Sequence, residues 1–154
     1  MMSVFQSLNI SASALTSQRL RMDVIASNMA NVDTTRSQMV NGEWQPYQRK
    51  TVSLQPKEAQ FSTMLNAAIG KSSHDSAGHG VRVSRISDDT ETPFKLVFDP
   101  THPDANNEGY VEMPNVDPLR EMVDLMSATR SYEANVTVLN ANKSMLMKAL
   151  EIGK

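Results

Sequence analysis

Residues 115–152, NVDPLREMVDLMSATRSYEANVTVLNANKSMLMKALEI, decide the fold of this chain. Asp117 can accept hydrogen bonds from the free N–H groups at a helix start, and Pro118 fits the first helical position, whose N–H has no partner. From Leu119 to Ile152 neither Gly nor Pro occurs. This composition predicts a single helix of roughly 50 Å, at about 1.5 Å per residue, that ends at Gly153.

A continuous seam runs along the predicted C-terminal helix, because its members alternate at spacings of three and four residues. These members are Leu125, Ala128, Tyr132, Asn135, Leu139, Asn142, Leu146 and Ala149. Further apolar residues line both flanks of the seam: Val138, Met145 and Ile152 on one side, and Met122, Thr129, Val136 and Leu150 on the other. One partner helix cannot cover so wide an apolar arc, so we expect other subunits to bury the flanks.

The N-terminal stretch predicts the partner helix, from about Val4 to Ala30. Ser3 and Gln6 have the spacing of a capping box, and Asn31 begins a run of residues that favour turns over helix interiors. Its stripe has the same three–four alternation: Phe5, Leu8, Ala12, Leu15, Arg19, Met22, Ala26 and Met29. We therefore expect the two helices to pair as an antiparallel coiled coil, with residue 30 near residue 119.

Arg19 interrupts the apolar N-terminal stripe. In the expected register it lies near Ser131, within about one turn of Tyr132 and Asn135. One hypothesis is that Arg19 hydrogen-bonds to one of these residues or to Glu133 and so fixes the axial register, as a buried polar residue can in a coiled coil. The alternative is that Arg19 points outward, to solvent or to another subunit.

The region between the helices holds almost all the Gly and Pro and predicts small extended elements. We expect strands over 46–55, 81–87, 93–98 and 110–113, a short helix over 57–69, and a loop over 70–80. The predicted fold class is therefore mainly α with a small β-rich middle domain. The predicted domains are an N-terminal axial helix and motif (1–36), a small mixed α/β middle domain (37–114) and a C-terminal axial helix (115–154) that packs with the first.

Composition excludes several classes of protein. A net charge of −2 gives no reason to expect nucleic acid as a partner, and the absence of cysteine excludes disulfides and thiolate metal sites. No apolar run approaches the roughly 18 residues of a membrane span, so we expect no direct span. We also expect no signal peptide, because Met1 to Gln18 carries no Lys or Arg.

Candidate chemical sites are weak. Asp104, Asn106, Glu108 and Gly109 match the first half of a calcium loop, but Asn115 stands where the bidentate acid is due. His74 and His79 lie in the predicted loop and His102 lies in a turn, so we expect no metal at any of them. Nucleophile, phosphate and dinucleotide motifs are missing. The sequence therefore predicts neither an enzyme nor a bound cofactor.

Two long segments resemble the bacterial flagellar axial proteins. Residues 28–36, NMANVDTTR, are similar to the asparagine motif that closes the N-terminal helix in that family, although Thr34-Thr35-Arg36 replaces the usual Thr-Pro-Gly-Tyr. Residues 109–117 (GYVEMPNVD), 121–123 (EMV), 127–135 (SATRSYEAN) and 143–145 (KSM) resemble the basal-body rod proteins of the same family. The similarity is nearly continuous from Phe94 to Lys154 and loose between Val40 and Thr92.

The resemblance implies a structural subunit of the proximal rod, the part of the drive shaft that carries torque from the motor to the hook. It implies export by the flagellar type III system, a place in the basal-body rod in the periplasmic space, and terminal helices around the export channel. The implied partners are other proximal rod subunits, copies of the chain itself, the ring–rod adaptor, the distal rod and, in transit, the export apparatus.

The residues predicted to serve subunit and axial packing come from both stripes and from the motif: Phe5, Leu8, Leu15, Arg19, Met22, Met29, Asn31, Leu125, Tyr132, Asn135, Val138, Leu139, Asn142, Met145 and Leu146. The helical methionines are interpreted either as core filler or as adaptable contacts with several neighbours. The alternative function is a soluble coiled-coil adaptor or secreted effector that forms a finite oligomer. A small metal-dependent enzyme has almost no support.

Overall fold

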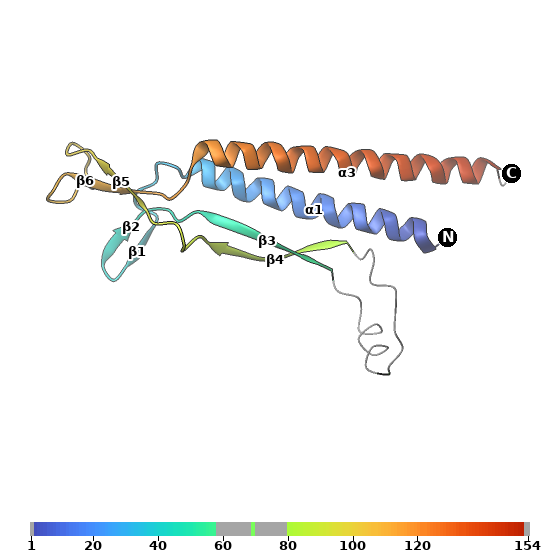
Figure 1. Ribbon diagram of the computed structural model, residues 1–154, viewed down its shortest axis with the longest axis horizontal. Coiled ribbons are helices and arrows are strands. Elements are labelled where there is room, and N and C mark those ends of the chain that lie inside the picture. The colour runs from blue at the N-terminus through green and yellow to red at the C-terminus, as the bar shows by residue number, and fades with distance from the viewer. Residues whose placement is uncertain (1, 58–68, 70–79, 153–154) are drawn as a thin grey trace. The chain divides into compact units, whose positions relative to one another are not determined.

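Two long helices and three two-stranded sheets make up the part of the chain that a computed structural model describes, residues 2–57, 69 and 80–152 (Figure 1). The chain divides into two compact units. The first unit contains Met1–Leu20, Ser53–Arg85 and Ala128–Lys154, and the second contains Arg21–Val52 and Ile86–Ser127. Each unit thus combines parts of both helices with parts of the region between them.

Both predicted helices are confirmed. Helix α1 spans Met2–Ala30 and helix α3 spans Pro118–Ile152. The Asp117 carboxylate accepts a hydrogen bond from the Leu119 N–H at 3.1 Å, so the expected N-cap is present. At the end of α1, the Asn31 N–H donates to the carbonyls of Ser27 and Asn28 and closes the last turn.

The two helices run antiparallel in the second unit. Arg21 of α1 pairs with Asp124 of α3, and Asn28, within the last turn of α1, hydrogen-bonds to Glu121 in the first turn of α3. The sequence predicted residue 30 near residue 119, so the Asn28–Glu121 pair agrees with that register to within about one residue. The expected pairing of the terminal helices is therefore present.

The sheets are small. Strands β3 (Lys50–Pro56) and β4 (Val81–Asp88) form one sheet, and β5 (Lys95–Phe98) and β6 (Tyr110–Met113) form another. β5 and β6 run antiparallel, with Val97 opposite Val111. Side chains on that side include the buried Val111, whereas Leu96 and Phe98 on the opposite side are exposed.

One hairpin was missed by the sequence analysis. Strands β1 (Gln38–Val40) and β2 (Glu43–Gln45) pair antiparallel around Asn41-Gly42. Asn41 and Gly42 have φ values of 54° and 91°, the left-handed conformation that a two-residue hairpin turn requires. Asn-Gly is the strongest short-range signal for such a turn, so the sequence did contain the necessary information.

Two predicted strands begin later than expected. β3 begins at Lys50 rather than at residue 46, because the preceding backbone is bonded elsewhere: the Tyr47 N–H donates to the Thr34 carbonyl and the Arg49 N–H donates to the Asn115 side chain. β5 begins at Lys95 rather than at residue 93. The helix expected over 57–69 and the loop with His74 and His79 lie outside the described residues, apart from their ends.

The interior is small and partly polar. The buried apolar side chains of the described residues are Val24, Ile25, Pro46, Tyr47, Val111, Pro114, Val116 and Ala128, and they are joined by the buried polar residues Ser11, Ser17, Asn28, Asn115, Glu121 and Asn142. Neither described helix is apolar enough over a sufficient length to span a membrane. A mixed interior of this kind depends on the pairing of its polar groups, which the next section describes.

Candidate functional site: polar junction and helix faces

Asn28 lies at the centre of a buried cluster in the second unit, where the end of α1 meets the start of β3 and the start of α3. Its amide nitrogen donates to the Lys50 carbonyl at 2.9 Å and to the Glu121 carboxylate at 3.1 Å. Its amide oxygen accepts from the Lys50 N–H at 2.9 Å and from the Tyr47 hydroxyl at 3.1 Å. The amide therefore uses both donors and both lone pairs.

Arg49 and Glu121 form the charged part of this cluster, which we call the polar junction: Asn28, Tyr47, Arg49, Asn115 and Glu121. The Arg49 Nε lies 2.6 Å from the Glu121 carboxylate, whose side chain is only 1% exposed. The guanidinium also approaches Asp89 at 3.7 Å and Asp124 at 3.5 Å. A carboxylate this deeply buried is tolerated because it is paired and hydrogen-bonded.

Asn115 completes the polar junction just before α3. Its amide nitrogen donates to the carbonyls of Asp89 and Thr92, and its amide oxygen accepts from the Arg49 N–H at 2.7 Å. Asn115 is the residue at which the calcium pattern required an acid. Its amide instead joins the loop after β4 to the start of β3, which is a structural role.

Asp89 lies beside the polar junction, and its carboxyl is held mainly by its own loop. Burial raises the pKa of its carboxyl, but hydrogen bonds from Thr92 and Glu91 and the nearby charge of Arg49 outweigh that effect, so the pKa lies below its ordinary value. The ionised form of Asp89 is therefore favoured in the folded chain.

The first half of the calcium pattern is also used for internal bonds. The Asp104 carboxylate accepts hydrogen bonds from the Thr35 hydroxyl at 2.7 Å and from the Arg36 Nε at 2.6 Å. Bonds from Arg36 and then Thr35, against a smaller effect of burial, lower the pKa of Asp104. The Asn106 side chain accepts from the N–H groups of Glu108 and Tyr110. The segment is thus a turn fastened to the residues that follow α1.

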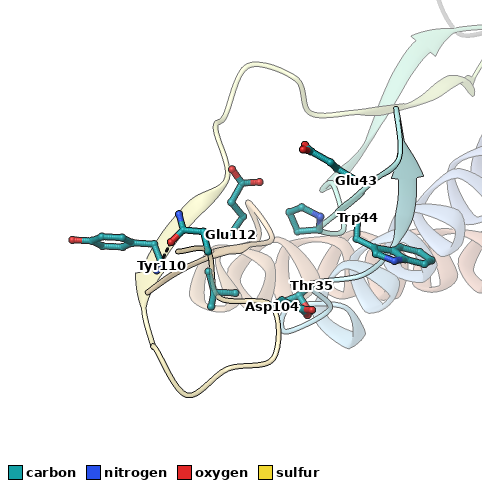
Figure 2. Close-up of a pocket in the computed structure, with 9 residues that line it drawn as sticks. Thr35, Glu43, Trp44, Asp104, Tyr110 and Glu112 are labelled. Carbon is teal, nitrogen blue, oxygen red and sulfur yellow. Dashed lines mark hydrogen bonds between the residues drawn. The ribbon is translucent and has the colours of Figure 1, made fainter. Parts of the chain in front are cut away.

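A hollow of about 350 Å³ lies beside this turn (Figure 2). Figure 2 shows Glu43 and Glu112 at one rim and Thr35 beside Asp104 at another, with the Tyr110 ring pointing away. Trp44 of the β1–β2 hairpin also lines it. Asp104 already accepts hydrogen bonds from Thr35 and Arg36. The hollow is therefore in part the space around these internal hydrogen bonds.

The structure places the expected seam of α3 on the inward side of that helix. Its members are buried or half-buried from Leu125 to Leu146, and only Ala149 is exposed: Leu125, Ala128, Tyr132, Asn135, Leu139, Asn142 and Leu146. Asn142 is buried, and the Asn135 amide donates to the Ser131 carbonyl of its own helix. The inward stripe of α3 therefore follows the heptad pattern of the sequence.

The stripe expected on α1 is not its most deeply buried stripe. Arg21 and Asn28, whose side chains bond to α3, belong to a stripe one residue earlier, which also contains the buried Ser11 and Ile25. One residue corresponds to about 100° around the helix. Consequently the apolar stripe, which we call the outer seam, lies at the edge of the interface: Phe5, Ala12, Arg19 and Ala26 are exposed, and Leu8, Leu15, Met22 and Met29 are half-buried.

The hypothesis that Arg19 sets the register within the chain is wrong. Its side chain is exposed and makes no ion pair with any residue that the structure describes. Arg21 makes the interhelical contact instead, 3.3 Å from Asp124. Two residues turn a helix by about 200°, so Arg19 and Arg21 point in nearly opposite directions. The structure thus agrees with the alternative in which Arg19 points outward.

Asn31 and the two flanks of α3 occupy different surroundings. The Asn31 amide donates to the Ser27 carbonyl at 2.8 Å and accepts from the Thr34 hydroxyl, so this residue closes α1. Val138 and Met145 on one flank are exposed, as is Ile152 at 86%. On the other flank Met122 and Leu150 are exposed, whereas Thr129 and Val136 are half-buried. Both flanks thus leave apolar side chains uncovered by the described part of the chain.

Most of the polar junction was missed by sequence reasoning. Asn28, Asn115 and Glu121 stand in segments quoted for the resemblance, and Asn115 was also considered as an incomplete calcium ligand, but none was predicted to bond to another. Arg49 and Glu121 lie 72 positions apart. A single sequence carries no signal for such a distant pair, although a Glu in the first turn of a helix suits the helix dipole.

Comparison with known proteins gives matches at both ends of the chain and over its whole length. Residues 8–37 match the family model of flagella basal body rod proteins, and residues 107–152 match that of the C-terminal region of flagellar basal body rod FlgEFG proteins. The flagellar basal-body rod protein FlgC of Bacillus subtilis is 65% identical over 153 residues, which cover 99% of this chain and 100% of that protein.

More distant relatives have the same name. The flagellar basal-body rod protein FlgC of Borreliella burgdorferi is 43% identical over 98% of both chains. That of Salmonella typhimurium is 40% identical over 99% of this chain and 100% of the relative. The similarity therefore extends through the region between the helices, where the motif-based resemblance was loose.

Proposed function

Because the chain belongs to the FlgC family of flagellar basal-body rod proteins, we propose that it forms part of the proximal rod and transmits torque there. Its family is structural, its place is the flagellar basal body, and it assembles with other components of the rod. The proposal concerns its position within that rod, its neighbours and the surfaces that carry load. We propose no catalytic activity for it.

The observation that carries this proposal is the uncovered apolar surface of two long helices. Phe5 is 66% exposed, and Met145, Leu150 and Ile152 are exposed at the other end of the chain. Apolar surface of this extent marks an interaction site. Along long helices an exposed apolar surface supplies many contacts between subunits. Many such contacts suit a rod whose subunits must not slip past one another as it turns.

The same surfaces suggest which parts of the chain lie inside the rod and which lie outside. We propose that residues 1–36 and 115–154 form the inner axial layer around the export channel, and that residues 37–114 face outward. The helices carry the extended apolar stripes, whereas the intervening residues form three small sheets and bonded turns. The polar junction fastens the two parts of the second unit together through Arg49 and Glu121.

The proposed neighbours are the other proximal rod subunits, further copies of this chain, the ring–rod adaptor and the distal rod, all in the periplasmic space. We propose that the chain reaches the rod through the flagellar type III export apparatus.

The residues proposed to contact other subunits are those that the chain leaves exposed or half-buried at the edges of the helix pair: Phe5, Leu8, Leu15, Arg19, Met22, Met29, Val138 and Met145. The residues proposed to hold the helix pair together are the inward members of α3 and the cap of α1: Asn31, Leu125, Tyr132, Asn135, Leu139, Asn142 and Leu146. Methionine suits contacts with several different neighbours because its side chain is flexible.

A complementation experiment tests the proposal. A strain without its own gene for this protein is supplied with a version that carries a small tag in the exposed turn at Asn106-Asn107, and basal bodies are purified and imaged with a tag-directed label. We expect swimming to return and the label to lie on the rod close to the membrane ring. Label elsewhere in the basal body, or a finite soluble oligomer without incorporation, would contradict the proposed position.

A further inference from the structure

We propose that the outer seam of α1 binds a defined flank of α3 from a second copy of this chain, an inference that rests on the rod function proposed above. This alanine flank lies one residue before the inward stripe of α3 and consists of Ser131, Ala134, Val138, Ala141 and Met145. All of its members except the half-buried Ser131 are exposed. The following observations select this surface and this occupant.

The outer seam and the alanine flank lie on opposite sides of the helix pair in the first unit. The seam follows the inward stripe of α1 by one residue, and the flank precedes the inward stripe of α3 by one residue, about 100° in each case. Because the helices are antiparallel, these rotations lead to opposite sides. The seam of one copy can therefore meet the flank of the next, and the contact repeats head to tail instead of closing as a dimer.

The side chains of the outer seam and of the alanine flank complement each other in size when the two helices take the same register as α1 and α3 within one chain. With Asn28 opposite Glu121 as the reference, an antiparallel α3 from a neighbour brings Ala141 opposite Leu8 and Ala134 opposite Leu15. Val138 comes within one residue of Ala12. Three contacts thus join a large and a small side chain, which is the condition for knobs to enter holes between two helices, and at the end of the seam the exposed Phe5 comes within one residue of the exposed Met145.

Charge agrees with the same pairing. No side chain in residues 1–18 is charged, and no member of the alanine flank is charged. Between Phe5 and Leu15 the contact therefore buries no unpaired ion, which would be costly. Arg19, the first charge on the outer seam, comes within one residue of Ser131, whose hydroxyl can accept a hydrogen bond. Both surfaces also border the interface between α1 and α3, so the second copy extends an interface that is already formed.

The other flank of α3 fits less well. It holds Glu133, which could pair with Arg19, and the exposed Asn140 and Met147. This flank follows the inward stripe of α3 by one residue, so it lies on the same side of the helix pair as the outer seam. Contact between them would join two copies face to face and close a pair, which cannot extend along a rod. It therefore provides a matched control surface.

Cross-linking between two different variants tests the proposal, and the absence of native cysteine makes the chemistry unambiguous. Cells without their own copy produce Ala12→Cys and Val138→Cys variants together, and assembled basal bodies are oxidised. We expect a disulfide-linked dimer that is absent when either variant is produced alone. The control pair, Ala12→Cys with Asn140→Cys, should give no dimer.

The outcomes separate this inference from the proposed function. If both variants enter basal bodies and the cells swim, but no dimer forms or the control pair links instead, the inferred contact is wrong and the rod function stands. If neither variant, nor the unmodified chain, is found in basal bodies, the proposed function itself fails.

A size exchange provides the second test. Leu15→Ala should leave a gap against Ala134 of the neighbour, and Ala134→Leu should overfill the same place, so each change alone should cause a loss of basal bodies per cell. The chain with both changes should regain them, because that contact then again joins one large and one small side chain. Failure of the double variant to exceed either single variant would overturn the pairing.

Discussion

Asn28 shows how much a single buried side chain can contribute to stability when every hydrogen-bonding position of its amide is occupied. Its amide has four hydrogen-bond positions and all four are occupied by groups from three parts of the second unit, Tyr47, Lys50 and Glu121. An aspartate has almost the same shape but no N–H groups and an added charge. Substitution at this position therefore tests the hydrogen bonds without creating a cavity.

Asn28→Asp should lower the free energy of unfolding by about 3 kcal/mol at neutral pH, because a second carboxylate would be buried beside Glu121 and two donors would be lost. The loss should shrink in acid, where one carboxyl takes up a proton. Urea unfolding of the purified protein at pH 7 and pH 4 measures both. Asn140→Asp, at an exposed position, should change stability by less than about 0.5 kcal/mol; similar losses at both positions would count against the junction.

Asp89, beside the polar junction, makes the stability of the folded chain depend on pH. The pKa of Asp89 in the folded chain lies below the ordinary value of about 3.9. The ionised carboxylate is therefore more stable in the folded than in the unfolded chain. Its contribution to stability is therefore fully present above about pH 4 and is lost as the pH falls through the folded pKa. Asp89→Asn should be less stable than the unmodified chain at pH 7, and the two should converge in acid. A difference that stays constant from pH 7 to pH 2 would exclude this account.

At the scale of elements, Gly80 is the point where β4 meets α1 in the first unit. Gly80 has a φ of 82°, and a Cβ there would overlap the Ser13 hydroxyl and lie 3.4 Å from the Cα of Ile10. The Ser13 hydroxyl also accepts a hydrogen bond from the Val81 N–H at 3.2 Å. The glycine is therefore required both by its backbone conformation and by the close approach of the helix.

Gly80→Ala should reduce stability by more than Gly42→Ala. Gly42 has a φ of 91° but no atom within 4 Å of the added carbon, so its replacement should cost only the strain of the left-handed conformation, about 1–2 kcal/mol. At Gly80 crowding against α1 should add about 1–3 kcal/mol. Thermal unfolding of both variants decides the comparison. Equal losses of stability in the two variants would mean that Ser13 and Ile10 can move away from the added carbon at no cost in free energy.

The elements differ in how far sequence alone predicts them. The long helices follow from spacing, from the Asp117 cap and from the lack of Gly and Pro, and all three are local features. The inward side of α1 did not follow, because its stripe mixes the polar Ser11, Arg21 and Asn28 with Ile25, while the more apolar stripe lies at the edge. The spacing of hydrophobic residues identifies the most apolar face of a helix. In a subunit built for assembly, that face need not be the one that its own chain covers.

At the scale of the whole molecule, stability is distributed unevenly along both helices. The part of α1 in the second unit contributes the buried Val24, Ile25 and Asn28, whereas residues 5–20, whose burial the structure describes in the first unit, contribute Ser11 and Ser17. Long helices depend on such burial, because helix propensity alone is weak. The outer seam and the flanks of α3 therefore need neighbours before the ends of the helices become stable.

Hydrogen exchange on the isolated subunit should follow this gradient. We expect slow exchange for amides in residues 21–30 and 119–128, which the polar junction holds, and fast exchange for residues 5–20 and 130–152. In assembled basal bodies both regions should be protected. Uniform slow exchange along both helices in a subunit shown to be monomeric would contradict the dependence on neighbours.

The polar junction could not have been predicted from one sequence for a related reason. Its bonds join positions tens of residues apart, such as Arg49 to Glu121 and Asn28 to Lys50, and none of these residues belongs to a local pattern that implies a partner. The Asn-Gly hairpin is the opposite case. Its signal was local and complete, and the prediction failed only because the turn was not recognised.

The β1–β2 hairpin has a spectroscopic consequence. Trp44 is the only tryptophan of the chain, and its side chain is 53% exposed beside the hollow lined by Tyr110 and Glu112. Indole emission shifts toward the blue when water leaves the ring, so tryptophan fluorescence, excited apart from the three tyrosines, reports on one hairpin alone. Assembly that covers the hairpin will shift the emission, and assembly through the helices alone will leave it unchanged. The native chain therefore carries its own optical probe for the order in which its surfaces are buried.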